Sequence, residues 1–305
     1  MNAQTLDPQD GDGRRAADPM ATGEAQLASD GVAPTVGPET RASEPPRSAS
    51  PGLPDVVPLV PGDIAVWVQK GWADFVAAPV IGLFYGGCFA VMGLLIAWTF
   101  VNSPQWTLAL CAGFLLIGPF LAIGLYSASR ARENGRPCLL ADSLVAWDRN
   151  VGALVLYLGA IMVLEMLWSR SALVIFAVSF NTMPSATGTL ALILDPENIG
   201  FVVTYVGVGA IFAGLIFATS VISIPMIMDR DTDGISAAIT SIRVCLRNPV
   251  TMFLWGAVIT LLVVLSMPPF FLGLVVVGPV IGHASWHAYR QAVEADPGAH
   301  PRADT

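Results

Sequence analysis

Six long apolar runs, separated by short polar segments, limit what this chain can fold into. A helix needs roughly 20 apolar residues to cross a bilayer. Runs of this kind occupy residues 80–100, 106–129, 151–180, 200–228, 249–267 and 270–289. The third and fourth runs exceed the length needed, so these helices tilt, kink or extend past the bilayer. We therefore predict an all-α polytopic membrane bundle of six transmembrane helices in three hairpins.

The composition agrees with this class and excludes others. The chain is 54% hydrophobic and 12% charged, whereas soluble domains are about 25% charged. The net charge is -8, and the cations form no clustered basic footprint, so nucleic acid is not an expected partner. None of the four cysteines forms a Cys-x-x-Cys pair, and no Walker A, nucleophile elbow or dinucleotide fingerprint is present.

The domain boundaries follow from the change in composition. Residues 1–60 are rich in Ala, Pro, Gly, Ser and acidic residues, and we expect a disordered cytoplasmic tail without a secretory signal. Residues 61–293 form the predicted transmembrane domain, and residues 294–305 form a disordered C-terminal tail.

The cations predict the orientation. Cytoplasmic loops of membrane proteins carry an excess of arginine and lysine. Of the nine arginines within residues 61–293, seven follow the second and fourth runs: Arg130, Arg132, Arg136, Arg149, Arg230, Arg243 and Arg247. We therefore expect a multi-pass protein of the bacterial inner membrane with both termini cytoplasmic and the lipid bilayer as its solvent.

An amphipathic helix is predicted before each hairpin. In residues 61–78 the apolar positions recur at helical spacing, and Asp74 is expected on another face. In residues 234–248 Ile235, Ile239 and Leu246 share one face, and Thr240 is expected on the polar face with the arginines. Together with a segment in residues 135–150, these helices predict three units of surface helix plus hairpin, which is an internal repeat.

A second repeat joins residues 118–130 to residues 278–290. Each copy begins with Gly-Pro inside an apolar run, has an aromatic residue eight positions later, and has an arginine twelve positions later. The aromatic residues are Tyr126 and Trp286, and the arginines are Arg130 and Arg290. We interpret both copies as helices that kink and leave the membrane through an aromatic and a cation.

Several blocks of sequence resemble a known family. They are Gly71-Trp72-Ala73-Asp74-Phe75, Gly118-Pro119-Phe120-Leu121, Ser223-Ile224-Pro225-Met226, Asn248-Pro249 and Gly282-His283-Ala284-Ser285-Trp286-His287. Over residues 64–293 the chain resembles the bacterial domain of unknown function 2189 family of predicted integral membrane proteins. The resemblance implies no established activity, although some members carry the label cytochrome c oxidase subunit.

His283 and His287 are the histidines with the clearest chemical interest. They are four residues apart and share one helix face, which could hold one metal ion. Asp229, Asp231 or Cys245 could supply a third ligand, whereas a bis-histidine haem would need a second chain. The alternative is that His283 forms a hydrogen bond between helices, and that His287 lies in an aromatic belt at the membrane interface. The cofactor is therefore unknown, and none is predicted.

Glu165 is the carboxylate that lies deep in an apolar run. Ionisable groups inside membranes are costly and are often functional. Arg170 follows five residues later, so Glu165 and Arg170 are candidate intramembrane functional charges. The alternative is that Glu165 lies near the outer surface, where Arg170 reaches it.

Two ladders of small residues predict close helix packing. Gly82 and Gly86 form one ladder, and Gly278 and Gly282 form the other. Because a catalytic set is lacking, we predict a non-enzymatic accessory or assembly subunit of a larger membrane complex, such as a respiratory one, with other membrane subunits as partners. The alternatives are a small-molecule or ion transporter or channel built from parallel repeats, and a membrane enzyme with a metal at His283 and His287.

Overall fold

The computed structural model describes residues 53–103, 106–146, 150–180, 195–230 and 232–293. In these residues every regular element is helical, apart from one isolated antiparallel bridge between Val56 and Val293. The elements in chain order are α1 (Asp63–Ala77), α2 (Pro79–Asn102), α3 (Thr107–Glu133), α4 (Leu140–Leu144), α5 (Val151–Ser179), η4 (Pro196–Asn198), α7 (Ile199–Ser220), α8 (Ser223–Asp229), α9 (Gly234–Arg247), α10 (Pro249–Leu265) and α11 (Leu274–Ala292). The all-α prediction is confirmed.

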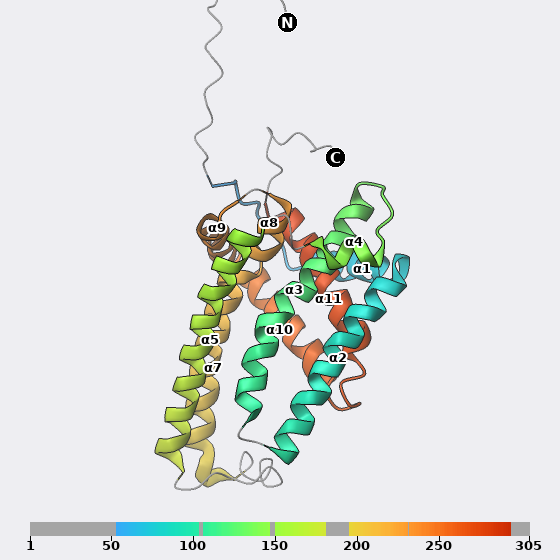
Figure 1. Ribbon diagram of the computed structural model, residues 1–305. Helices are drawn as coiled ribbons and strands as arrows, with labels where there is room; N and C mark the ends of the chain where they lie inside the picture. The colour runs from blue at the N-terminus through green and yellow to red at the C-terminus, as the bar shows by residue number, and fades with distance from the viewer. Residues whose placement is uncertain (1–52, 104–105, 147–149, 181–194, 231, 294–305) are drawn as a thin grey trace, which may run out of the picture. The chain divides into compact units, whose positions relative to one another are not determined.

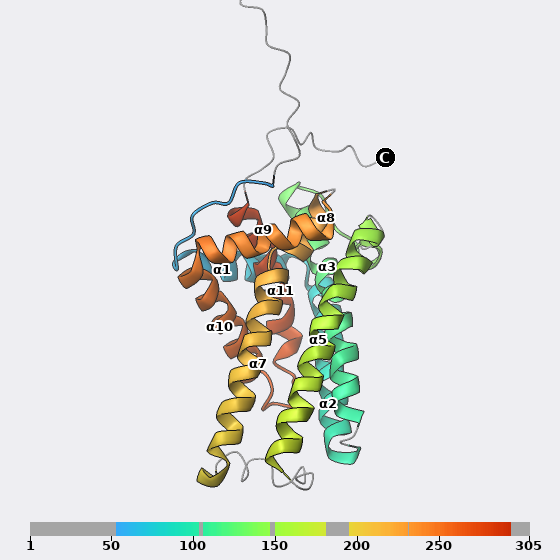
Figure 2. The same ribbon diagram turned by 90° about the vertical axis from the view of Figure 1, so that its left-hand side faces the viewer.

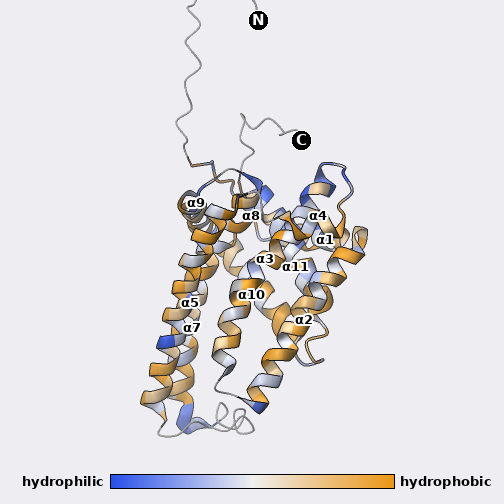
Figure 3. Ribbon diagram, in the orientation of Figure 1, coloured by the Kyte–Doolittle hydropathy of each residue, from blue (hydrophilic) through white to orange (hydrophobic). Residues whose placement is uncertain are grey.

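Within the described ranges, four helices are long and apolar enough to cross a membrane. They span Pro79–Asn102, Ala109–Glu133, Val151–Ser179 and Pro196–Asp229. Helices α2, α3, α5 and α7 run side by side, and Figure 3 shows mostly hydrophobic residues along them. Helices α9 and α10 form a fifth candidate, bent by 105°. The structure therefore contains four to five candidate spans, and the count of six stays a prediction.

Helices α10 and α11 form a hairpin that reaches less far from α9 than α5 and α7 do (Figures 1 and 2). On its own, neither α10 nor α11 meets the length and hydropathy criteria for a span. At the tip of the hairpin, Phe271 packs against Gly93 of α2, and α2 continues for nine residues beyond that level to Asn102. Phe270, beside it, is exposed.

Prolines and one carboxylate set where several helices begin. Pro79 and Pro249 occupy the first turns of α2 and α10, where a missing N–H costs nothing. The Asp233 side chain accepts hydrogen bonds from the backbone N–H groups of Ile235 and Ser236, both at 2.9 Å, and so caps α9. The chain therefore turns from α9 into α10 within one residue, Asn248.

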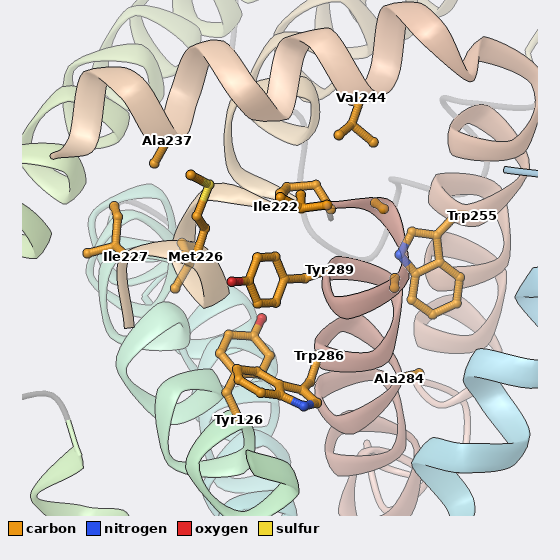
Figure 4. Close-up of a cluster of buried hydrophobic side chains, with 14 of the residues drawn as sticks. Tyr126, Ile222, Met226, Ile227, Ala237, Val244, Trp255, Ala284, Trp286 and Tyr289 are labelled. Carbon is orange, nitrogen blue, oxygen red and sulfur yellow. The ribbon is translucent and has the colours of Figure 1, made fainter. Parts of the chain in front are cut away.

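The core is organised around α11, which contacts α1, α2, α3, α8 and α10. Trp286 and Tyr289 of α11 are fully buried with their ring centroids 5.5 Å apart, and Tyr126 of α3 packs beside Trp286 at 6.4 Å. Figure 4 shows these three rings below α9, with Met226 and Ile227 of α8 close to them. Buried aromatic pairs of this kind add about 0.5–1.5 kcal/mol each beyond the area that they bury.

Helix α9 presents three different sectors rather than two. Its buried residues are small or polar and face the rest of the chain: Gly234, Ala237, Thr240, Ser241 and Val244. The large apolar residues Ile235, Ile239 and Leu246 are exposed on a second sector, and Arg243 and Arg247 lie on a third. The sequence predicts Thr240 on the polar face with the arginines, whereas in the structure the Thr240 side chain is fully buried against the rest of the protein.

Helix α1 also differs from its predicted faces. Asp74 is buried together with Ile64, Trp67 and Phe75, whereas Trp72 is exposed. The expectation that Asp74 lies away from the apolar face was therefore wrong. The residue is close to Trp67 around the helix because seven positions make almost two complete turns.

The predicted tails lie mostly outside the described residues, because residues 1–52 and 294–305 are not described. Residues 53–60 belong to the predicted N-terminal tail, and two of them pack against the helices. Val56 and Leu59 are buried, and the Leu59 N–H donates to the side-chain oxygen of Asn248 at 2.7 Å. The Val57 N–H donates to the carbonyl of Ala292 at 2.9 Å. This segment therefore lies beside the end of α11.

Candidate functional site

A cluster of buried and half-buried polar side chains lies where α1, α3, α8 and α11 meet. We call it the polar cluster, and its members are Asp74, Ser129, Arg130, Arg132, Glu133, Asp229, His283, His287, Tyr289 and Arg290. Only three of these side chains are carboxylates, and each of them has a positively charged partner. The cluster is therefore close to neutral, as a buried site of this kind must be.

Asp74 is the most buried carboxylate of the polar cluster, and it is only 5% exposed. Its Oδ2 atom accepts a hydrogen bond from the Ser129 hydroxyl at 2.6 Å and another from Nε2 of His287 at 2.8 Å. Its Oδ1 atom pairs with the guanidinium of Arg132. One side chain thus connects α1 to both α3 and α11.

The electrostatics of Asp74 follow from these contacts. Burial alone would raise the pKa of the carboxyl group, but hydrogen bonds from His287 and Ser129 outweigh burial. The net result is a pKa below the ordinary value of 3.8, so Asp74 is ionised at neutral pH. His287 faces a second carboxylate as well, because its Nδ1 atom lies 3.6 Å from Oε1 of Glu133.

His283 has a different environment from His287. It is fully buried, and its Nδ1 atom lies 2.8 Å from the Ser129 hydroxyl oxygen. Because Ser129 donates its own hydrogen to Asp74, it accepts from His283, which fixes the proton of His283 on Nδ1. The Nε2 atom then carries a lone pair, and among the described residues it has no hydrogen-bond partner.

Asp229 is a second carboxylate of the polar cluster that has several partners. Its Oδ1 atom lies 3.0 Å from Nε of Arg130, and its Oδ2 atom lies 3.3 Å from Nη1 of Arg290. The Tyr289 hydroxyl donates to Oδ2 at 2.8 Å. The Nε atom of Arg290 also lies 3.3 Å from Oε2 of Glu133, and this ion pair connects the contacts of Asp229 with those of Asp74.

The two predicted metal-ligating histidines lie on one face of α11, as their spacing requires, but their ring nitrogens point to different partners. Those of His287 face Asp74 and Glu133, and Nδ1 of His283 faces Ser129. In the described part of the chain, no three His, Cys, Asp or Glu side chains are grouped as a metal ion would need. The binding of one metal ion by both histidines stays a prediction. It would require a ring nitrogen of His287 to leave its carboxylate partner and bind the ion.

Glu165 and Arg170 both lie on α5. Glu165 is 9% exposed, whereas Arg170 is exposed, and the contacts of the described residues include no ion pair between them. Trp168, between them in the sequence, packs against Tyr205 and Phe212 of α7. Glu165 is thus a buried carboxylate inside a candidate span.

The four predicted packing glycines lie at close approaches between helices. A Cβ atom at Gly86 would overlap the carbonyl oxygen of Val275 in α11. At Gly82 it would overlap the ring of Phe75. At Gly278 and Gly282 it would lie 2.8 Å and 2.5 Å from the side chains of Phe89 and Leu125, respectively. These positions bring α2, α3 and α11 together.

Sequence reasoning missed Asp74, Ser129 and Glu133 as members of a site. For Asp74 one signal was available, because a carboxylate in the apolar sector of a helix must find a partner when that sector is buried. Ser129 offered no comparable signal, because serine is common near the ends of membrane helices and its partners come from α1 and α11.

Residues 107–229 match the model of a family described as predicted integral membrane protein (DUF2189). The match runs from the start of α3 to the end of α8, and it confirms the predicted family resemblance over that region. With its apolar helices, this chain is a multi-pass integral membrane protein. No curated protein and no solved structure matches the chain.

Proposed function

We propose that this multi-pass membrane protein is a non-enzymatic accessory or assembly subunit of a larger membrane complex, with a respiratory complex as the first candidate. The observation that carries the proposal is the uneven packing of the spans. In the most apolar window of Pro196–Asp229, 0% of the residues are buried inside the chain, and 17% are buried in Val151–Ser179. For Pro79–Asn102 the share is 33%. The α5–α7 hairpin therefore leaves most of its surface for lipid or for another subunit.

The outward face of α7 favours another helix as a neighbour. Gly200, Gly207 and Gly214 are spaced seven residues apart and so lie on one face, and all three are exposed. Within the described part of the chain, a Cβ atom at any of them would meet nothing within 4 Å. Small residues along one helix face let a second helix approach closely in a membrane, where packing rather than hydrophobicity drives association.

The proposed architecture has six spans in three hairpins, each preceded by a cytoplasmic amphipathic helix, with disordered cytoplasmic tails and both termini in the cytoplasm of a bacterium. The arginines of the polar cluster gather at the same end of the bundle as α1 and α9, which supports that orientation. The test is a periplasmic reporter fused at residue 140 or at the C-terminus. Activity of either fusion would contradict the proposal.

The contacts of the two Gly-Pro copies support an internal repeat. The equivalent aromatic residues Tyr126 and Trp286 pack against each other at 6.4 Å. The equivalent arginines Arg130 and Arg290 bind the two oxygens of the same carboxylate, Asp229. Two duplicated helices that meet around a local two-fold arrangement would place equivalent residues on a shared partner in this way.

A stable partner is tested by extraction from the native membrane in mild detergent, followed by mass spectrometry. We expect a second polypeptide at a fixed ratio, and we expect Gly207→Leu with Gly214→Leu to release it. The matched control is Val91→Leu on the exposed face of α2, which should retain the partner. A protein that purifies as a clean single species before any substitution would contradict the proposal.

A second candidate function is a transporter or channel, and Glu165 is the observation that favours it. A carboxylate nine-tenths buried within a span is costly unless it binds an ion or a proton. This candidate predicts that Glu165→Gln abolishes ion flux or proton coupling in vesicles. Arg170→Gln, which removes an exposed charge five residues away, should leave flux intact. Unchanged flux in Glu165→Gln would rule this candidate out.

A further inference from the structure

A cavity of about 200 Å³ opens at the end of the bundle, between α3, α4 and α8. We call it the α3–α4 cavity. Its walls come from the last turns of α3, the segment that leads into α4, α4 itself, Ala146 two positions beyond α4, and α8. The lining residues are Ser127, Arg130, Ala131, Arg136, Pro137, Cys138, Asp142, Ala146 and Met228. The cavity is not lined by Asp74 or by the partners of Asp74, and among its lining residues only Arg130 belongs to the polar cluster.

Two polar side chains of α3 face this cavity from one side of the helix. Ser127 and Arg130 are three residues apart, so they lie next to each other on the helix surface. Arg130 binds Asp229 through Nε, and the contacts of the described residues leave its two Nη groups available to another acceptor. The Ser127 hydroxyl likewise has no hydrogen bond to another described residue. Arg136 adds a second guanidinium to the lining.

The lining combines cations with one carboxylate and several apolar groups. One carboxylate oxygen of Asp142 already has a partner, because Oδ2 accepts a hydrogen bond from the Leu139 N–H at 3.2 Å. A carboxylate beside two guanidinium groups disfavours a small, highly charged free anion. It tolerates a phosphodiester that carries an amine or hydroxyl group nearby. Ala131, Ala146 and Met228 provide an apolar wall for the carbon atoms next to such a group.

The depth of the cavity identifies where such a phosphodiester would come from. The lining begins at Ser127, near the end of the candidate span Ala109–Glu133, where the apolar part of α3 gives way to arginines. Phospholipid headgroups lie at this boundary, and basic pockets between membrane helices bind them there. A guanidinium presents a planar pair of donors that matches two phosphate oxygens.

We propose that the α3–α4 cavity binds the phosphodiester headgroup of a membrane phospholipid, with Arg130 and Ser127 as the donors to the phosphate oxygens. The bound lipid fills the opening between α3 and α4, and its phosphate oxygens accept hydrogen bonds from the Arg130 Nη groups that Asp229 does not use. This site is independent of the proposed partner surface on α7, so either proposal can fail without the other.

The test measures binding of defined phospholipids to the delipidated full-length protein by native mass spectrometry. We expect one phospholipid per chain to bind tightly, and we expect Ser127→Ala with Arg130→Lys to weaken its binding about tenfold, because charge remains but the paired donors are lost. Arg247→Gln, at the exposed end of α9, is the control and should bind as the wild type does. Equal binding by all three proteins would overturn the proposal.

A second measurement needs no arginine substitution. Cys138 lines the cavity, so a bound headgroup should slow its alkylation by a maleimide in a background in which Cys88, Cys111 and Cys245 are alanine. Phospholipid vesicles should protect Cys138, and inorganic phosphate at the same concentration should not. Protection by phosphate alone would overturn the headgroup in favour of a free anion, and no protection by either would overturn the site itself.

Discussion

Replacing Asp74 by alanine is the sharpest test of how the polar cluster holds α1 in place. The carboxylate accepts hydrogen bonds from two donors that are themselves buried, Ser129 at 0% and His287 at 9% exposure. Each hydrogen bond to a charged acceptor contributes about 1.5–3 kcal/mol. The third partner, Arg132, has a side chain that is 47% exposed, so its ion pair is screened and adds about 0–1 kcal/mol. We therefore expect Asp74→Ala to lower the free energy of unfolding by about 3–5 kcal/mol.

Asp74→Asn separates charge from shape. It keeps the volume and one acceptor oxygen but loses the charge, so we expect a loss of about 1.5–3 kcal/mol, between wild type and Asp74→Ala. The assay is reversible unfolding in mixed micelles, followed by tryptophan fluorescence, because Trp67 of α1 is fully buried. Asp55→Asn removes an exposed charge and should stay within about 0.5 kcal/mol of wild type. If Asp74→Ala also stayed in that range, the connecting role of Asp74 would be refuted.

Three further predictions concern pH, packing and metal. Because the pKa of Asp74 in the folded protein lies below the ordinary value of 3.8, the contribution of Asp74 to stability is present above that value and is lost as pH falls through the lower folded pKa. The stability difference between wild type and Asp74→Asn should therefore shrink below about pH 4. Gly86→Ala should cost about 1–3 kcal/mol, because its Cβ would overlap a backbone oxygen of α11, whereas the adjacent Gly87→Ala has open space and should be close to neutral; equal costs in unfolding experiments would contradict this packing. Elemental analysis decides the metal hypothesis, which requires one ion per wild-type chain that is lost in His283→Ala/His287→Ala.

The helical class and the four longest spans could be predicted because they depend only on local composition. A run of about 20 apolar residues has few alternatives to a membrane helix. The Gly-Pro repeat was also visible as a local pattern. That its arginines converge on Asp229 was not, because the two copies are 160 positions apart and only the packing of α3 against α11 brings them together.

The buried and exposed faces of α1 and α9 could not be predicted from hydrophobicity, because each of these helices can face water, lipid or the rest of the protein. Apolar periodicity separates the residues that avoid water from those that do not, but it does not separate protein from lipid. In α9 the large apolar residues are exposed and the small ones are buried, and in α1 a carboxylate is buried. The partners of Asp74 lie 55 and 213 positions away, so no local pattern identifies it.

We propose that the chain works as part of a larger membrane complex. The most direct test of this proposal is the mass of the wild-type particle released from its own membrane by native lipid nanodiscs, without detergent. We predict a mass that exceeds one chain by a distinct second polypeptide in a constant ratio across preparations. A particle that contains only one copy of this chain and lipid would contradict the claim.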